Sequence, residues 1–160
     1  MELLCVSQIL FGEYNLKLTI LNTREQKEIY GFLKEQWGFA EKLDYVFLLS
    51  AKDKIYISKK SVFDVDLDKL NISSVGMYFG EIDKGGLRLS IEGSQMIGPK
   101  ASKGIVDVEE FSDWMSGDQI PCDEKLHSYV IVRCKKDFLG CGKAKEGKVL
   151  NYVGKVRRLH

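Results

Sequence analysis

The first half of the chain contains one segment with a clear helical period of hydrophobic residues, NTREQKEIYGFLKEQWGF. Ile29, Leu33 and Trp37 recur every four residues in it, and polar side chains occupy most of the positions between them. Side chains with this spacing lie on one side of an α-helix. The pattern therefore predicts an amphipathic helix with a single buried stripe.

Residue types at both ends of this segment indicate where the helix begins and ends. Thr23 and Gln26 have the spacing of a capping box, in which the first side chain accepts from the amide three residues on and the second bonds back to the cap. Gly38 is suited to the left-handed conformation that ends many helices. The sequence predicts a helix between Thr23 and Gly38.

Short apolar runs on either side of the helix are typical of β-strands. LKLTIL precedes the helix with alternating apolar and polar residues, and YVFLLS and KIYIS follow it on either side of a polar AKDK turn. Two such runs joined by a short polar turn predict a hairpin. We therefore expect a small α+β unit in the N-terminal part.

The pattern changes after DLDKLNISS, where glycine becomes frequent and clear helical periodicity ends. One helical turn is expected at VEEFSDWMSG, among strand-like runs that end in glycine or charged turns: SVGMYFGEI, GLRLSIEG, SYVIVRC, FLGCGKA and KVLNYV. Such spacing is typical of a small β-barrel. The predicted fold class is α+β, with an N-terminal α+β domain over residues 1–73 and a β pseudo-barrel over residues 74–160.

Charge is distributed unevenly along the chain, although its net value is only +1. From Arg133 to the C-terminus there are nine Lys or Arg and two acidic residues, a net charge of +7, so the rest of the chain carries −6. Such an asymmetry suggests a polyanionic partner for the basic end. A charged run is also common on a merely solvated surface, so charge alone does not establish binding.

Several functional classes lack their residue patterns in this chain. The four cysteines include no Cys-x-x-Cys pair, and neither His127 nor His160 has a ligand pattern around it, so we expect no metal site. No nucleophile pairs with a base and no cofactor loop is visible, so we expect no catalytic residue, no cofactor and no enzymatic activity. Apolar runs are far shorter than the roughly 20 residues that span a bilayer. The start has no signal-peptide pattern, and we expect a cytoplasmic protein without membrane contact.

Three segments of the C-terminal half, IEGSQMIGP, WMSGDQI and YVIVRCKKDFLGCGKAKEGKVLNYVGKVRRL, together resemble a PUA domain, an RNA-binding pseudo-barrel. The last of them is similar to the C-terminal end of the Fmu/Sun-type RNA cytosine-5 methyltransferases. Gly154 stands where the signature of that family has proline. A small α+β unit followed by a PUA domain also resembles the stand-alone ribosome-biogenesis factors of pre-PUA plus PUA design.

The resemblance implies a non-catalytic protein that binds structured RNA, either ribosomal or transfer RNA. Its place would be in ribosome biogenesis and rRNA processing, or as an accessory to rRNA or tRNA modification. The methyltransferases of that family need an α/β cofactor domain, and no parallel βαβ pattern precedes Cys122, the cysteine that follows Pro121. We therefore expect the RNA-binding part without the catalytic part.

Candidate RNA-binding residues follow from charge, glycine and strand alternation. Arg88 alternates with the apolar Leu87 and Leu89, and we expect it to point outward. Asn151 is either a base reader or a buried hydrogen-bonding group. The predicted set is Arg88, Gly93, Ser94, Gln95, Lys100, Lys103, Lys143, Lys145, Lys148, Asn151, Lys155, Arg157 and Arg158.

A second hypothesis is a protein-interaction adaptor. In it, an acidic N-terminal unit that includes the DVDLDK stretch docks on an RNA methyltransferase or a ribosome-assembly factor. Tyr30 and Tyr45 are candidate contact residues of that unit, although aromatic residues are more often part of a core.

Overall fold

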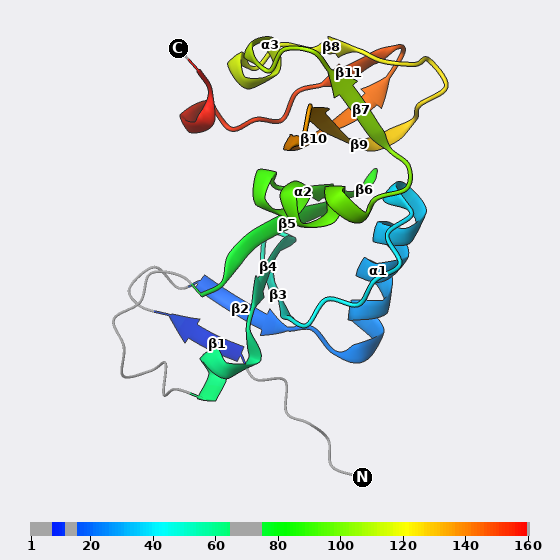
Figure 1. Cartoon of the computed structure of the whole chain (residues 1–160). Helices are drawn as coiled ribbons and strands as arrows, with labels where there is room; N and C mark the ends of the chain where they lie inside the picture. The colour runs from blue at the N-terminus through cyan, green and yellow to red at the C-terminus, as the bar shows by residue number, and fades with distance from the viewer. Residues whose placement is uncertain (1–7, 12–15, 65–74, 160) are drawn as a thin grey trace.

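Two β-sheets, one above the other in Figure 1, form the framework of the molecule. The computed structural model describes residues 8–11, 16–64 and 75–159. The first sheet has the strand order β1-β2-β3-β4-β5-β6, and the second has the order β7-β9-β10-β11-β8. Helices α1, α2 and α3 accompany the sheets, so the predicted α+β class is confirmed.

The first sheet is an antiparallel meander. Its strands are β1 (Gln8–Phe11), β2 (Leu16–Ile20), β3 (Val46–Ser50), β4 (Lys54–Ser58), β5 (Met77–Asp83) and β6 (Gly86–Leu89). The β3–β4 hairpin predicted around AKDK is confirmed, with Val46 opposite Ser58. A short 3₁₀ turn, η1 (Lys60–Asp64), follows β4.

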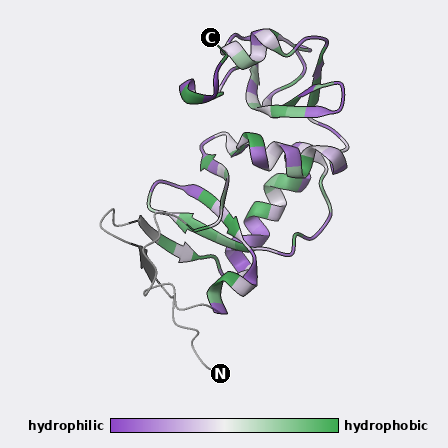
Figure 2. Ribbon diagram, turned by 60° about the vertical axis from the view of Figure 1, so that its left-hand side comes forward, coloured by the Kyte–Doolittle hydropathy of each residue, from purple (hydrophilic) through white to green (hydrophobic). Residues whose placement is uncertain are grey.

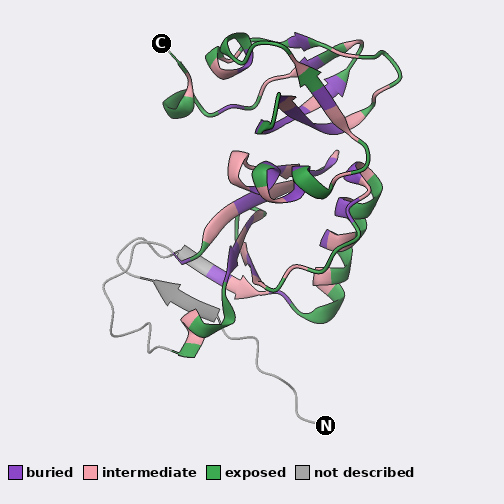
Figure 3. Ribbon diagram, in the orientation of Figure 1, coloured by how far each residue is buried: buried purple, intermediate pink, exposed green. Residues whose placement is uncertain are grey.

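Helix α1 (Thr23–Trp37) packs one face against this sheet. Ile29, Leu33 and Trp37 are its buried residues, as their spacing predicts. Figure 3 shows buried and exposed positions recurring along this helix. The hydropathy colouring of α1 in Figure 2 alternates accordingly along its length. The C-cap Gly38 has φ 64°, which confirms the predicted left-handed end.

The predicted capping box of α1 is wrong by one residue. The N-cap is Asn22, whose side chain accepts hydrogen bonds from the amides of Arg24 and Glu25. The Glu25 carboxylate accepts in turn from the Asn22 amide at 2.8 Å. Gln26, expected in that role, instead donates its side-chain amide to the carbonyl of Leu21 at 2.8 Å.

The second sheet is mixed and strongly curled, as a pseudo-barrel requires (Figure 1). Its strands are β7 (Ile105–Val108), β8 (Ile120–Pro121), β9 (Ser128–Cys134), β10 (Asp137–Lys145) and β11 (Lys148–Leu150). Strand β7 pairs with β9 in parallel, and the other pairs are antiparallel. Helix α3 (Ser112–Ser116) closes the far side of the sheet by burying Trp114 in its core.

The two glycines of the Gly140-x-Gly142 motif serve packing in β10. Gly140 has φ 118° next to the register shift between β9 and β10. A Cβ on Gly142 would lie 2.5 Å from Val149 and 2.6 Å from both Leu150 and Trp114. The motif therefore allows close approach of strand and helix, and it does not form a phosphate loop.

Helix α2 (Ile91–Ile97) and the 3₁₀ turn η3 (Gly98–Lys100) lie between the two sheets (Figure 1). One hydrophobic cluster runs through this layer: it includes Trp37 of α1, Phe79 of β5, Ile97 of α2 and Ile131 of β9. The two sheets therefore share a core.

The predicted domain boundary between residues 73 and 74, and most of the DVDLDK stretch, lie outside the described residues. The first sheet continues past that boundary, because β5 pairs with β4. The division into domains 1–73 and 74–160 stays a prediction.

Candidate nucleic-acid interface

A cleft of 220 Å³ lies where the chain after β11 passes the start of α2. We call this chain segment, residues 151–159, the tail, and the cleft the tail cleft. Its main polar and aromatic lining residues are Tyr78, Arg88, Ser90, Glu92, Tyr152 and Arg157. Four separate parts of the chain contribute to it: the β5–β6 hairpin, the first turn of α2, Gly140 and Cys141 of β10, and the tail.

Asn151 anchors the beginning of the tail. Its side-chain amide donates to the carbonyl of Trp114 at 2.7 Å and to that of Asp118 at 2.9 Å. Its side-chain oxygen accepts from the amide of Val153 at 2.8 Å. Of the two roles considered from the sequence, the structure shows the internal hydrogen-bonding one, because both the nitrogen and the oxygen of the side-chain amide are already hydrogen-bonded within the fold.

The end of the tail is held by α3 and by the tail itself. The Nε of Arg158 donates to the carbonyl of Val153 at 3.0 Å, and its guanidinium covers Gly117, the C-cap of α3. The Leu159 amide donates to the carbonyl of Met115 at 3.0 Å. Arg158, a predicted RNA contact, is therefore largely used in fixing the tail.

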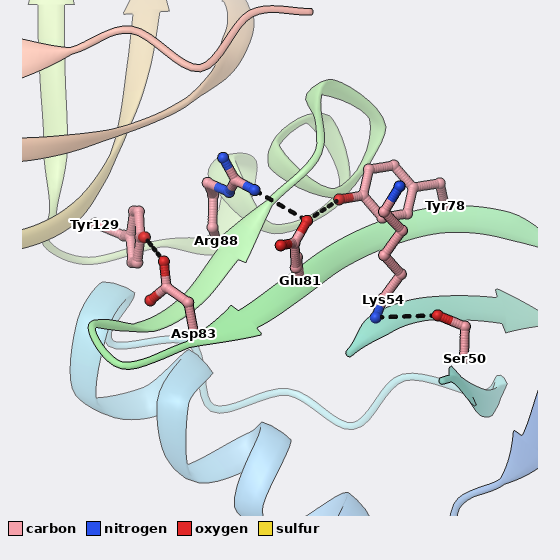
Figure 4. Close-up of polar contacts among 7 residues, drawn as sticks. All are labelled: Ser50, Lys54, Tyr78, Glu81, Asp83, Arg88 and Tyr129. Atoms are coloured by element: carbon pink, nitrogen blue, oxygen red, sulfur yellow. Dashed lines mark hydrogen bonds and ion pairs between the residues drawn. The ribbon is translucent and has the colours of Figure 1, made fainter. Parts of the chain in front are cut away.

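Arg88 lies at the centre of the tail cleft and joins it to the first sheet. Its guanidinium carbon is 4.5 Å from the ring centroid of Tyr152, and its Nη2 is 2.9 Å from the Glu81 carboxylate (Figure 4). The Tyr152 side chain remains exposed, at 41% of its full area. A planar cation stacked on a partly open aromatic ring offers both a charge and a stacking surface.

Tyr78 contributes a neutral hydroxyl to the same cleft. Burial and the nearby Glu81 carboxylate raise the pKa of Tyr78 to about 12. Its hydroxyl lies 3.5 Å from that carboxylate (Figure 4). At neutral pH the group therefore stays protonated and donates its one proton to Glu81.

An ion pair between Arg157 of the tail and Glu92 of α2 forms the opposite side of the cleft. Burial disfavours the Glu92 carboxylate, but hydrogen bonds from its own amide and from Arg157 lower its pKa on balance. Ser90, the N-cap of α2, uses its side-chain oxygen to accept from the Gly93 amide. The pair ties the tail to the first turn of α2.

A second polar group lies beside the tail cleft, at the β5–β6 turn. Tyr129 donates its hydroxyl to the Asp83 carboxylate (Figure 4), and the Gly85 amide donates to the same carboxylate at 2.6 Å. Partial burial opposes ionisation of Asp83, but these bonds and the charge of Lys143 lower its pKa on balance. The Lys143 Nζ lies 5.5 Å from the Tyr129 ring centroid.

Gly93 and Ser94, predicted to offer groups to RNA, are buried inside the fold. A Cβ at Gly93 would lie 2.3 Å from the Phe79 carbonyl oxygen, and its amide donates to Ser90. Ser94 has no exposed surface and donates its hydroxyl to the Ser90 carbonyl at 2.8 Å. Both residues let α2 pack closely on β5, and neither presents a free donor at the surface.

The predicted basic residues separate into groups. Arg88 and Arg157 both line the tail cleft, and the exposed Lys155 precedes Arg157 by two residues on η4 (Lys155–Arg157). Lys145 and Lys148 flank the β10–β11 turn, away from the cleft lining. The remaining predicted residues lie elsewhere: Gln95 is exposed on α2, Lys100 pairs with Glu41 at 3.0 Å, and Lys103 and Lys143 lie towards α1 and the β5–β6 turn.

The sequence prediction missed the aromatic part of the site, Tyr78 and Tyr152. A signal existed for Tyr152, because the alternation along β11 continues into the tail: Val149 is buried, so Lys148 and Tyr152 share the outer face. Tyr78 carries no such signal, since only the fold brings it next to Arg88.

Exposed acidic side chains occur around β7, α3 and β8 of the second sheet. Residues 74–132 hold ten acids and five bases, whereas residues 1–73 hold eleven acids and ten bases. The acidic surplus therefore lies in the C-terminal half, and the description of the N-terminal unit as acidic is wrong. The exposed carboxylates around β7, α3 and β8 are Asp107, Glu109, Glu110, Asp113, Asp118, Asp123 and Glu124.

Within residues 8–11, 16–64 and 75–159, no group of three or more Cys, His, Asp or Glu side chains is arranged to hold a metal ion. The Cys141 thiol lines the tail cleft, and complete burial raises its pKa to about 12, so it is not a reactive thiolate at neutral pH. None of the helices in this part of the chain combines the length and apolar character needed to cross a bilayer.

Residues 105–159 match a family model described as the PUA domain of the methyltransferase RsmF. The matched segment runs from β7 to the end of the tail and so includes Tyr152 and Arg157. No curated protein sequence matches the chain. The predicted resemblance is confirmed over this segment: residues 105–159 are similar to the PUA domain in the C-terminal region of the Fmu/Sun-type methyltransferases.

Proposed function

We propose that this chain is a non-catalytic, cytoplasmic RNA-binding protein that holds structured RNA in the tail cleft. Its place is in ribosome biogenesis and rRNA processing, or as an accessory to rRNA or tRNA modification. The PUA domain supports RNA as the partner. The particular RNA and the particular pathway belong to the proposal.

One observation carries this proposal: Arg88 lies 4.5 Å from the ring centroid of the partly exposed Tyr152, inside a cleft that also contains Arg157. Single-stranded bases stack on such aromatic rings and on guanidinium planes, and arginine side chains also bind phosphate oxygens. The Tyr78 hydroxyl donates to Glu81, and its oxygen can accept a hydrogen bond from a base edge or a ribose 2′-hydroxyl.

The test is binding of the intact chain to ribosomal RNA fragments and to transfer RNA over a range of salt concentrations. Tyr152→Ala removes the exposed ring and keeps both ion pairs of the cleft. Loss of one stacked base costs about 1–3 kcal/mol, so the dissociation constant should rise roughly 5- to 150-fold. Lys136→Ala, an exposed change in the β9–β10 turn, is the matched control and should bind like the wild-type chain.

The salt dependence tests the phosphate contacts separately. Lys155→Ala removes an exposed charge at the edge of the cleft, and the slope of log K against log salt should become shallower by about 0.7–0.9 if that lysine neutralises one phosphate. A wild-type chain whose binding to both RNA classes is undetectable or independent of salt would contradict the proposed function.

A second candidate function, the adaptor, is favoured by the acidic surface around β7, α3 and β8 rather than by the N-terminal unit. Seven exposed carboxylates there suit a basic partner such as a ribosome-assembly factor or an RNA methyltransferase. The test is capture of such a partner by the intact chain and by an Asp107→Asn, Glu109→Gln, Glu110→Gln variant. Equal capture by both would exclude this surface as the docking site.

A further inference from the structure

A second groove, of 480 Å³, lies on the side of the molecule where α1 approaches the second sheet. Its walls are the C-terminal half of α1, the β5–β6 turn, the loop before β7 and the segment that leads into β9. Its lining residues include Glu35, Lys84, Gly85, Lys103, His127 and Tyr129. We call it the α1 groove.

The rim of the α1 groove is basic. Lys84 in the β5–β6 turn and Lys103 before β7 are both exposed, and neither forms an ion pair with another described residue. His127 is also exposed, and Glu35 is the acidic residue in the lining. Unpaired, hydrated lysines around a groove are suited to phosphate groups, which need charge without fixed geometry.

The α1 groove and the tail cleft are close neighbours. Tyr129 lines the α1 groove, although the residue is only 1% exposed. Its ring centroid is 6.2 Å from that of Tyr152, which lines the tail cleft, in an edge-to-face arrangement. One pair of adjacent rings therefore links the linings of the two depressions.

Lys143 adds a positive charge where the two depressions approach each other. Its Nζ lies 5.5 Å from the Tyr129 ring centroid and 2.6 Å from the position that a Cβ on Gly85 would take. Asp83 is the nearby acid, and its carboxylate already accepts from Tyr129 and from the Gly85 amide. Of the predicted candidates absent from the tail cleft, Lys103 thus lines the α1 groove, and Lys143 reaches Gly85, another of its lining residues.

We propose that an RNA strand held in the tail cleft continues past Lys143 into the α1 groove, where Lys84 and Lys103 contact its phosphates. This inference rests on the proposed function, because the tail cleft supplies the first contact. It adds that the ligand includes a single-stranded extension next to the part held by the tail cleft. The backbone of such an extension can follow the three lysines, whose charges neutralise its phosphates.

The experiment compares three labelled RNAs by fluorescence anisotropy: a stem-loop of about 10 base pairs, and the same stem-loop with a single-stranded extension of about 12 nucleotides on its 5′ or its 3′ side, long enough to fill a typical single-strand site. The intact wild-type chain should bind one of the extended RNAs about tenfold more tightly than the bare stem-loop. Lys84→Glu with Lys103→Glu should lose that gain and leave affinity for the bare stem-loop unchanged.

The controls separate this inference from the proposed function. Lys59→Glu with Lys60→Glu makes the same charge change at exposed positions at the start of η1 and should keep the gain. If neither extension improves wild-type binding, or if the Lys84 and Lys103 variant keeps the gain, the α1 groove does not bind RNA. If the wild-type chain fails to bind even the bare stem-loop, the proposed function and this inference fall together.

The α1 groove would also fit an acidic peptide, and a polyglutamate competitor tests that occupant. If RNA occupies the groove, polyglutamate should weaken wild-type binding of the extended RNA to the affinity measured for the bare stem-loop, and this effect should depend on Lys84 and Lys103. If polyglutamate binds through these two lysines but the extension gives no gain in RNA affinity, the groove binds a protein ligand and the proposal is overturned.

Discussion

Replacing Asn151 by alanine should weaken the fold itself, because this side chain makes three hydrogen bonds at 2.7–2.9 Å that hold the tail on α3. Each neutral hydrogen bond of this kind contributes about 0.5–1.5 kcal/mol net. Asn151→Ala should therefore lower the free energy of unfolding by about 3 kcal/mol, which corresponds to a fall in Tm of roughly 6–12 °C for a chain of this size.

The assay is urea unfolding followed by circular dichroism, with RNA affinity measured on the same samples. Gln119→Ala removes an exposed amide close by in the chain and should stay within about 0.5 kcal/mol of the wild-type value. Asn151→Asp should also be destabilised, since a carboxylate would face the carbonyls of Trp114 and Asp118. Wild-type stability of Asn151→Ala together with a loss of RNA affinity would refute this reasoning and make Asn151 a ligand contact.

Three further predictions concern stability. Gly142→Ala should destabilise the chain by about 1–3 kcal/mol in urea unfolding, because the new Cβ would lie 2.6 Å from Trp114. As a contrast, Gly31→Ala lies at an exposed helix position with open space and should stabilise the chain by about 0.5–1 kcal/mol. Gly154→Pro should raise the free energy of unfolding by about 0.4–1 kcal/mol, since Gly154 has φ −59° and its amide donates to no described residue. A lower free energy of unfolding in this variant would show that the tail needs glycine at this position. The folded-state pKa of Tyr78, about 12, lies above its unfolded value near 10. The contribution of Tyr78 to the free energy of unfolding is therefore complete below pH 10 and is lost between about pH 10 and 12. Tyr78→Phe should make the alkaline fall in stability shallower, and an unchanged pH profile would contradict this.

Local patterns were sufficient to predict α1, because its buried stripe depends only on the spacing of Ile29, Leu33 and Trp37. The capping box was placed one residue late, since Asn22 and Thr23 are both good N-caps and the choice depends on the Leu21 carbonyl that Gln26 reaches. The β3–β4 hairpin and the runs of the second sheet followed from alternation and turn residues in the same way.

The candidate site was only partly accessible to sequence reasoning. Alternation placed Arg88 correctly on the surface, but its partners Glu81 and Tyr152 come from a neighbouring strand and from the tail. Ser94 is polar and lies in a short helix, and only the packing of α2 between two sheets shows that it is buried. Charge counting also treated all lysines alike, whereas the fold divides them between two depressions and the β10–β11 turn.

The contact between the basic tail and α3 has a kinetic consequence. The tail is bonded to α3 and to Asp118, so its cations lie next to a region of exposed carboxylates. The fields of neighbouring opposite charges largely cancel beyond a Debye length, about 10 Å at 0.1 M salt. Long-range steering of RNA should therefore be weak, and added salt should act more on the dissociation rate than on the association rate.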